Sequence, residues 1–230
     1  MSKLIEGGKP EQMIARHIRR WELQQIRAPR EPGAPETIRR RTITLSRQCG
    51  SGGDALAREL AKRLGWHLFD RELVEYIAAQ AHARERVIAS LDEHVRSRME
   101  EWIRSLLDRN YLSPHAYLQH LMSVVLTVAH HGEAILVGRG CHLIVHPSTS
   151  LRVRVIGSCQ RRLDNLRSQA RLDEKSARIL LQQDDAERAA FVQTHFHHNI
   201  DDPADYDLVL NLDALDKNAA AETVLGALRA

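Results

Sequence analysis

Residues 42–64 begin with a short β-branched run and end with an amphipathic run of helical spacing. Between the two runs lie three glycines and several small side chains. Glycine at positions 50, 52 and 53 allows positive φ angles and removes side chains that would block a ligand. Successive backbone N–H groups in such a turn, followed at once by a helix N-terminus, form a site for phosphate oxygens. A plain glycine-rich turn between a strand and a helix has the same pattern. Residues 46–53 are therefore a candidate phosphate-binding loop.

The stretch departs from the common phosphate-binding loop in its charge. The usual pattern is G-x-x-x-x-G-K-[ST], in which the lysine follows the terminal phosphates, and Gly53 stands at the lysine position. Arg47 is the candidate replacement, because arginine is always charged and grips a phosphate at two points. Asp54 favours the helix dipole but repels a nearby phosphate. The loop by itself leaves both the phosphate site and the plain turn open.

Short apolar runs that alternate with amphipathic stretches predict the elements around this loop. Alternating strands and helices predict an α/β fold with a parallel sheet covered on both faces. Ligands of such sheets lie at the carboxyl ends of the strands, and Ser46, Asp70, Gly138 and Gly157 all fall there. The expected strands are residues 42–47, 66–69, 134–137, 151–156 and 206–211.

The remaining segments predict additions to this core. Residues 10–27 have the apolar spacing of an amphipathic helix, and a proline-rich linker follows them. We expect residues 1–41 to form this helix and linker, and residues 42–230 to form the main domain. Within that domain we expect a helical insertion at about 71–131 and a lid at about 159–175. The N-terminal helix is expected to pack on its own domain or on a second subunit as a homodimer.

Composition limits the classes of function. The 230 residues are 43% hydrophobic and 27% charged, with a net charge of +3. This excess suits phosphorylated ligands and is far below that of a dedicated nucleic-acid binder. No apolar run is long enough for a membrane span, and the N-terminus lacks the apolar core of a signal peptide. We therefore expect a cytoplasmic protein without nucleic-acid or membrane partners.

The histidines and cysteines do not predict a metal centre. The three cysteines lack metal-type spacing, and their odd number argues against a secreted disulfide framework. His195, His197 and His198 lie close together, but no carboxylate or cysteine completes a ligand set at convincing spacing. We therefore assign no metal-ligating residues.

Taken together, these positions resemble the cytidylate kinase-like family, a branch of the P-loop nucleoside monophosphate kinases. The similarity lies in residues 43–53 (ITLSRQCGSGG), 69–73 (FDREL), 137–140 (VGRG) and 151–153 (LRV). It implies a three-layer P-loop NTPase-type α/β fold with an inserted helical region and a short lid. It also implies ATP and Mg²⁺ as cofactors, and transfer of a phosphoryl group to a nucleoside monophosphate. Further matching positions are Arg162, Asp185, Arg188, Ala189, Asp202, Pro203 and residues 206–208.

The resemblance also implies roles for single side chains. Arg139 would bind the phosphate of the acceptor, and Arg162 would close on the donor from the lid. Asp185 and Arg188 lie on the same helix face, and would bind the acceptor pyrimidine nucleotide. The donor phosphates would be held by Ser46, Arg47, Gln48, Cys49, Gly50, Ser51, Gly52 and Gly53. Together with Arg47, the residues Arg139, Arg162, Asp185 and Arg188 are the predicted catalytic set.

Several of these residues have alternative interpretations. Asp70 and Arg71 are expected beside the acceptor, where Asp70 would orient it or hold Mg²⁺ through water; Asp70 could instead cap a helix. Arg162 could belong to a solvated basic helix face. Gly140 stands where true cytidylate kinases have an aspartate, which argues against CMP itself and leaves a CMP-like nucleotide or a related small molecule as the expected acceptor. A nucleotide-binding sensor without turnover and an interaction protein with a vestigial site also stay open.

Overall fold

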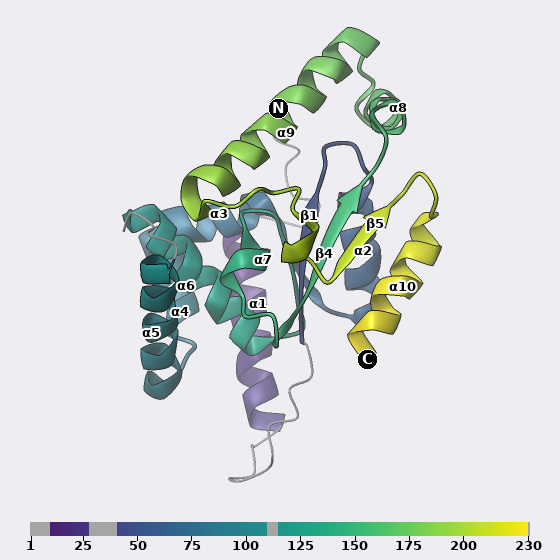
Figure 1. Cartoon of the computed structure of the whole chain (residues 1–230). Helices are drawn as coiled ribbons and strands as arrows, with labels where there is room; N and C mark the ends of the chain where they lie inside the picture. Colours follow the sequence, from purple (N-terminus) through teal and green to yellow (C-terminus); the bar gives the residue numbers. More distant parts are fainter. Residues whose placement is uncertain (1–9, 28–40, 110–114, 230) are drawn as a thin grey trace.

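A parallel sheet forms the centre of the molecule in the computed structural model, which describes residues 10–27, 41–109 and 115–229 (Figure 1). The strand order is β2-β3-β1-β4-β5, and every neighbouring pair is parallel. The predicted α/β fold with a parallel sheet is confirmed. The strands are β1 (Thr42–Arg47), β2 (His67–Phe69), β3 (Ala134–Val137), β4 (Ser150–Ile156) and β5 (Leu208–Asn211).

The central strand β1 is buried along its whole length, as expected for a parallel strand covered on both faces. Leu45 pairs in register with Val137 of β3 and with Val153 of β4. Since both neighbours run parallel to β1, the carboxyl ends of the three strands meet at one edge. The loop that follows β1 therefore lies beside the segments that follow β3 and β4.

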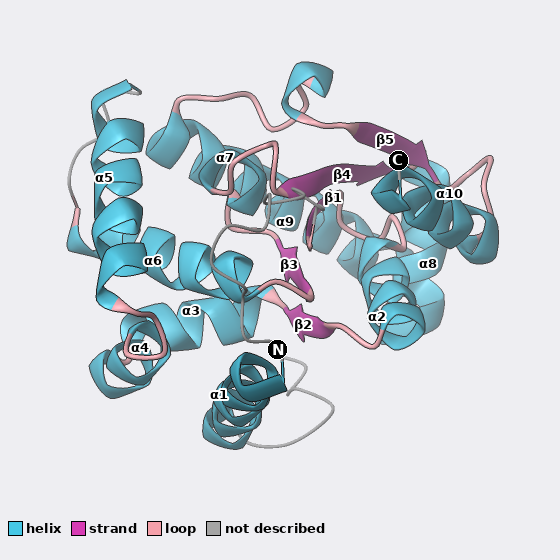
Figure 2. Ribbon diagram, turned by 90° about the horizontal axis from the view of Figure 1, so that it is seen from below, coloured by secondary structure: helices cyan, strands magenta, loops and turns pink. Residues whose placement is uncertain are grey.

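Helices cover both faces of the sheet (Figure 2). On one face, α2 and α10 bury apolar side chains such as Leu56 and Val224 against Ile43. On the other, α3, α6 and α7 pack around a larger core that contains Phe69 and Leu136. The helices are α1 (Pro10–Arg27), α2 (Gly53–Leu64), α3 (Arg71–Ala79), α4 (Ala81–Ile88), α5 (Glu93–Arg109), α6 (Ala116–His131), α7 (Cys141–Ile144), α8 (Cys159–Ala170), α9 (Glu174–Phe196) and α10 (Lys217–Arg229), with a 3₁₀ turn η1 (Pro203–Asp205).

The predicted N-terminal helix is present as α1, and it packs on its own domain. Ile14 and Trp21 are buried in the same core as Phe69. The Trp21 ring stacks on His131 with a centroid distance of 4.1 Å. The predicted proline-rich linker lies outside the described residues.

Helix α8 and the first residues of α9 cover the segment at about 159–175 for which a lid is expected, and a lid role for it stays a prediction. Figure 1 shows α9 crossing above the sheet at the end to which the strands point. Leu163 of α8 packs with Ala177 and Leu181 of α9, so the two helices share a small apolar core of their own. This packing places polar side chains of both helices above the loop that follows β1. Among the described residues, no helix has the length and apolar character needed to cross a membrane.

Candidate active site

The glycine-rich loop joins β1 to α2 and is fixed by its own hydrogen bonds. Gly50 and Gly52 adopt the left-handed conformation, with φ of +71° and +89°, which side chains other than glycine rarely tolerate. The Ser51 hydroxyl donates to the Gln48 carbonyl at 2.8 Å. The Gln48 side-chain oxygen accepts from the Gly157 backbone N–H at 3.2 Å. The loop is thus tied to the segment after β4 at the sheet edge where ligands bind.

The Arg47 side chain occupies the space in which a lysine at position 53 would begin. A Cβ added at Gly53 would lie 2.6 Å from the Arg47 Cβ, and one added at Gly138 would lie 2.9 Å from an Arg47 guanidinium nitrogen. Arg47 is only 8% exposed, and its Nε donates to an Asp54 carboxylate oxygen at 2.8 Å. The Arg47 side chain and a lysine at position 53 therefore cannot both be accommodated in this packing.

Four arginines from four different segments line one pocket at this edge, which we call the arginine pocket. Arg47 comes from β1, Arg71 from α3, Arg139 from the turn after β3 and Arg188 from α9. Phe191, Val192 and Ile200 give the pocket an apolar wall. The arrangement suits an anion joined to a ring or another apolar body. The other lining residues are Ser46, Gly138, Gly140 and His142.

The turn after β3 holds Arg139 in a conformation that few arginines adopt. Gly138, Arg139 and Gly140 have φ of 82°, 50° and 67° in succession. Arg139 forms an ion pair with Glu75, and its guanidinium lies 4.5 Å from the Phe191 ring centroid. A Cβ added at position 140 would overlap the ring of Phe196, so this packing requires glycine there.

Two adjacent acids on α9 reach the glycine-rich loop. Asp185 accepts a hydrogen bond from the Cys49 backbone N–H at 2.7 Å and pairs with Arg162 of α8. Asp184 accepts from Arg188 at 3.0 Å and from the Cys49 thiol at 3.4 Å. Arg188 also donates to the Arg47 carbonyl at 3.2 Å. Charged groups on both α8 and α9 therefore join these helices to the loop.

Asp185 and Arg188 were predicted to act together on the acceptor. Their charged atoms lie 3.8 Å apart, and both are close to the loop. Arg188 also lines the arginine pocket, whereas Asp185 contacts the loop backbone. A role of this pair toward the acceptor stays a prediction.

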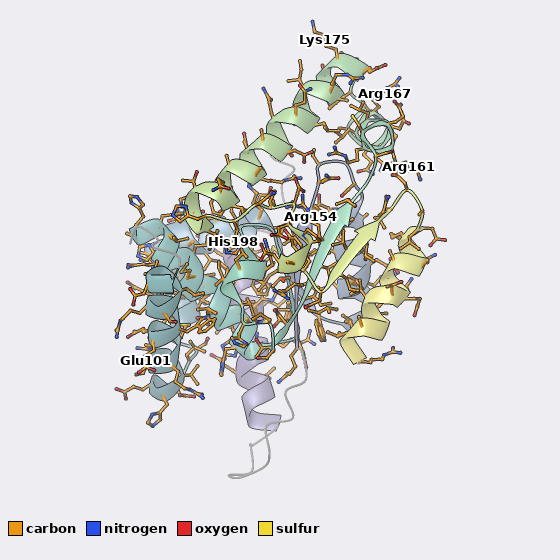
Figure 3. All side chains as sticks on the ribbon, viewed as in Figure 1. Glu101, Arg154, Arg161, Arg167, Lys175 and His198 are labelled. Atoms are coloured by element: carbon orange, nitrogen blue, oxygen red, sulfur yellow. The ribbon has the colours of Figure 1, made fainter. Side chains whose placement is uncertain are left out.

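Arg162 does not belong to a solvated face. It is 8% exposed, and it donates to the Cys49 carbonyl at 3.3 Å. Asn165, one turn later, donates to the Gly50 carbonyl at 2.9 Å. Arg161 and Arg167 of the same helix project away from the molecule (Figure 3). Arg162 therefore contacts the loop, whereas Arg161 and Arg167 are exposed to solvent.

Burial also determines the chemistry of nearby titratable groups. The pKa of the Cys49 thiol rises to about 12, first because it is buried and then because Asp184 is adjacent, so the thiol stays protonated. The pKa of Asp70 is raised by burial as well. Asp70 accepts from the Leu73 backbone N–H at 2.9 Å and caps α3. In this structure the Asp70 side chain therefore acts as the N-terminal cap of α3.

Sequence reasoning did not select several residues of this region. Glu75 lies one helical turn after Arg71, and Phe191 lies three residues after Arg188, so helix spacing could have indicated both. Arg154 interrupts an apolar strand run, which is the signal that could have singled it out. Asp184 is adjacent to Asp185, and nothing in the sequence indicates that it too contacts the loop.

The carboxylates beside the loop, Asp54 and Asp70, are of the kind that bind Mg²⁺ in proteins. Mg²⁺ ordinarily keeps several waters and binds one or two carboxylates together with substrate phosphates. Asp54 directly follows Gly53, where phosphate-binding loops carry a Mg²⁺-binding hydroxyl, and its charge contributes to the raised pKa of Asp70. Within the described ranges, no group of three or more His, Cys, Asp or Glu side chains could hold a metal ion alone.

A parallel α/β sheet with a glycine-rich loop after its central strand defines a P-loop-type α/β domain, and four arginines line one pocket beside that loop. Comparison with known proteins gives the family. The model of the cytidylate kinase-like family matches residues 42–214, and the chain belongs to this family. No curated protein matches the chain.

One solved structure shares the fold. An uncharacterized protein from Eubacterium ventriosum superposes with a TM-score of 0.66 at 16% identity, covering 83% of this chain and 98% of that one. Shikimate kinase from Bacteroides thetaiotaomicron gives a TM-score of 0.42 at 13% identity, covering 82% and 98%. Dephospho-CoA kinase from Campylobacter jejuni gives 0.33 at 10% identity, covering 81% and 97%. At such low TM-scores the two kinases add no support.

Proposed function

We propose that this protein is an ATP-dependent phosphotransferase whose acceptor is a nucleoside monophosphate, CMP-like, or a related small phosphorylated molecule. One observation carries the proposal: Arg47, Arg71, Arg139 and Arg188 converge from four segments on one pocket beside a glycine-rich loop. So many cations at the carboxyl ends of parallel strands suit the meeting of two phosphorylated ligands. Membership of a kinase-like family supports the same chemistry.

Phosphoryl transfer requires little covalent help from a protein, because positioning and charge neutralisation supply most of the rate. In this proposal the loop N–H groups hold the donor phosphates, and Arg47 supplies the charge that a lysine at position 53 supplies elsewhere. Arg162 and Arg188 approach the loop from the lid and exclude water. Bound Mg²⁺ supplies further charge neutralisation at the donor phosphates, and Asp54 and Asp70 are the carboxylates that would hold it.

The acceptor side of the proposal is built around Arg139. Glu75 and the Phe191 ring fix its guanidinium from two sides, so the side chain is already ordered for a phosphate. Val192 and Ile200 contribute apolar surface for the rest of the acceptor. In this proposal Asp185 keeps its pairing with Arg162, and a donor phosphate replaces it at the Cys49 N–H.

The test is turnover by the purified full chain with ATP and Mg²⁺ across a panel of nucleoside monophosphates, nucleosides and small phosphorylated acceptors. One member is expected to give a phosphorylated product and stoichiometric ADP. Arg139→Ala and Arg47→Ala are expected to lower kcat/KM by at least about 100-fold. Arg167→Ala, an exposed arginine of α8, is the matched control and is expected to keep full activity.

A second candidate is a nucleotide-binding sensor without turnover. It is favoured by the absent lysine at Gly53, because backbone N–H groups can bind a phosphate without the charge that promotes its transfer. Nucleotide binding without product across the whole panel would establish the sensor and refute the kinase. Failure of every nucleotide to bind would leave an interaction protein with a vestigial site.

A further inference from the structure

A second hollow lies directly beside the arginine pocket, and we call it the central pocket. Arg47 and Arg188 line both pockets, so the two share a wall. Gln48, the first residue of the loop, also lines the central pocket. The hollow therefore lies between the proposed donor loop and the proposed acceptor site. Its remaining lining residues are Arg154, Asp185, Ala189, Ile200 and Asp201.

Arg154 extends from β4 into this region although it is 4% exposed. It pairs in register with Ser46, the residue that precedes Arg47 at the end of β1. One guanidinium nitrogen donates to the Ser46 hydroxyl at 2.7 Å, and another donates to Asp201 at 2.6 Å. The buried Nε has no hydrogen-bond partner. Figure 3 shows Arg154 in the middle of the molecule, beside β1 and β4.

The hydrogen bonds of Arg154 leave its charge poorly compensated. A guanidinium carries five N–H donors, and burial without partners costs free energy. The Asp201 side chain is 61% exposed, so water screens its charge and weakens this ion pair. Nothing in the proposed chemistry so far uses Arg154.

Three arginines line the central pocket, and two of them, Arg47 and Arg188, also pair with Asp54 and Asp184 outside it. Arg47, Arg154 and Arg188 face two carboxylates, and one of these, Asp185, is shared with Arg162 outside the pocket. Burial lowers the pKa of Arg188, and the adjacent charge of Arg47 lowers it further, so these cations repel one another. An anion in the central pocket would relieve this repulsion.

We propose that Arg154 contacts the phosphoryl group in transfer, and that the central pocket holds the γ-phosphate of the donor. The identity of the donor rests on the proposed function. In the transfer, an acceptor oxygen bonds to the γ-phosphorus while the bond from that phosphorus to the β–γ bridging oxygen breaks, and ADP leaves with that oxygen and its electron pair. Arg154 neutralises the oxygens of the moving group and takes no proton.

The experiment compares the binding of ATP and ADP, each with Mg²⁺, by calorimetry on the full chain. Wild type is expected to prefer ATP. Arg154→Ala is expected to lose about tenfold or more of the ATP affinity, with the ADP affinity changed less than twofold. Asp201→Asn is expected to raise the ATP affinity, because Arg154 is then free to turn to the ligand. Arg152→Ala, which removes an Arg–Asp207 pair from the same strand outside both pockets, is expected to leave both affinities unchanged.

The opposite signs at positions 154 and 201 separate a ligand contact from a structural ion pair. A purely structural pair would make both substitutions weaken ATP and ADP equally, and that result would overturn the proposal. If Arg154→Ala does not fold, Arg154→Lys is tested in its place. It is expected to lose ATP affinity selectively. An equal loss of ADP affinity would contradict a contact between Arg154 and the γ-phosphate.

Binding of inorganic phosphate tests the anion site without a nucleotide donor. Phosphate is expected to stabilise wild type against heat and to stabilise Arg154→Ala less. If wild type shows this response but binds neither ATP nor ADP, the proposed function fails while the anion site stands. If wild type responds to neither phosphate nor nucleotide, the inference fails as well.

Discussion

The carboxylate of Asp185 accepts a hydrogen bond from the Cys49 backbone N–H at 2.7 Å, although the two residues are 136 positions apart. The other oxygen of the same carboxylate pairs with Arg162. A loop N–H that suits a phosphate oxygen is thus already bound to a negatively charged group from α9. A donor phosphate that uses this N–H must displace Asp185.

Replacing Asp185 by Asn therefore has two opposite effects. The free protein is expected to lose about 1–3 kcal/mol of unfolding free energy, because two charge-assisted hydrogen bonds weaken. The rise in Tm caused by ATP is expected to be larger than in wild type, since the competing charge is gone. Thermal shift with and without ATP measures both effects. Glu174→Gln, on an exposed turn of α9, is the control, and a smaller ATP shift in Asp185→Asn would refute the competition.

Restoring the usual lysine at position 53 is expected to fail on its own. A Cβ there lies 2.6 Å from the Arg47 Cβ, so Gly53→Lys is expected to lower the unfolding free energy by about 1–3 kcal/mol. Removing the Arg47 side chain in the double variant Arg47→Ala/Gly53→Lys is expected to recover part of this loss and to support more turnover than either single variant. Chemical denaturation of the four proteins measures the coupling.

The matched control for that cycle is Gly226→Ala, at a glycine with open space around it. It is expected to stay within about 0.5 kcal/mol of wild type or to gain stability, because alanine favours the helix. Additive effects at positions 47 and 53 would show that Arg47 does not occupy the place of the lysine.

Buried histidines predict a loss of stability in mild acid. Burial lowers the pKa of His17 to about 3 and the pKa values of His67 and His131 to about 4, against an ordinary value of 6.5. The unfolded chain therefore binds more protons than the folded chain once the pH falls below about 6.5. Stability is fully present above this pH and is lost as the pH falls toward 4, by at most about 1.4 kcal/mol per pH unit for each histidine.

The His17→Phe variant tests this pH dependence at one site. Both ring nitrogens of His17 lack hydrogen-bond partners, so the substitution removes a titrating group without breaking a hydrogen bond. The fall in Tm between pH 6.5 and 4 is expected to become shallower than in wild type. His82→Phe, at an exposed position, is expected to keep the wild-type slope. Equal slopes for all three proteins would contradict the assignment.

The sequence by itself determined the fold class and the position of the loop. Strand-length apolar runs alternate with helical patterns, and burial of both sheet faces follows from that alternation. Gly50 and Gly52 stand where a positive φ is required, so local conformation alone placed the turn between β1 and α2. The missing lysine directed attention to the charge of Arg47, and the family resemblance implied a role for Arg139.

The tertiary structure decided which charged groups meet. Arg161 and Arg162 are adjacent in sequence, yet the packing of α8 on α9 buries Arg162 at the loop and leaves Arg161 exposed. Arg154 enters the central pocket because β4 pairs with β1, and Asp185 reaches Cys49 because α9 crosses the strand ends. These contacts join residues more than 100 positions apart. Sequence periodicity assigns a residue to a face of its own element, but the partner across that face depends on how the elements pack.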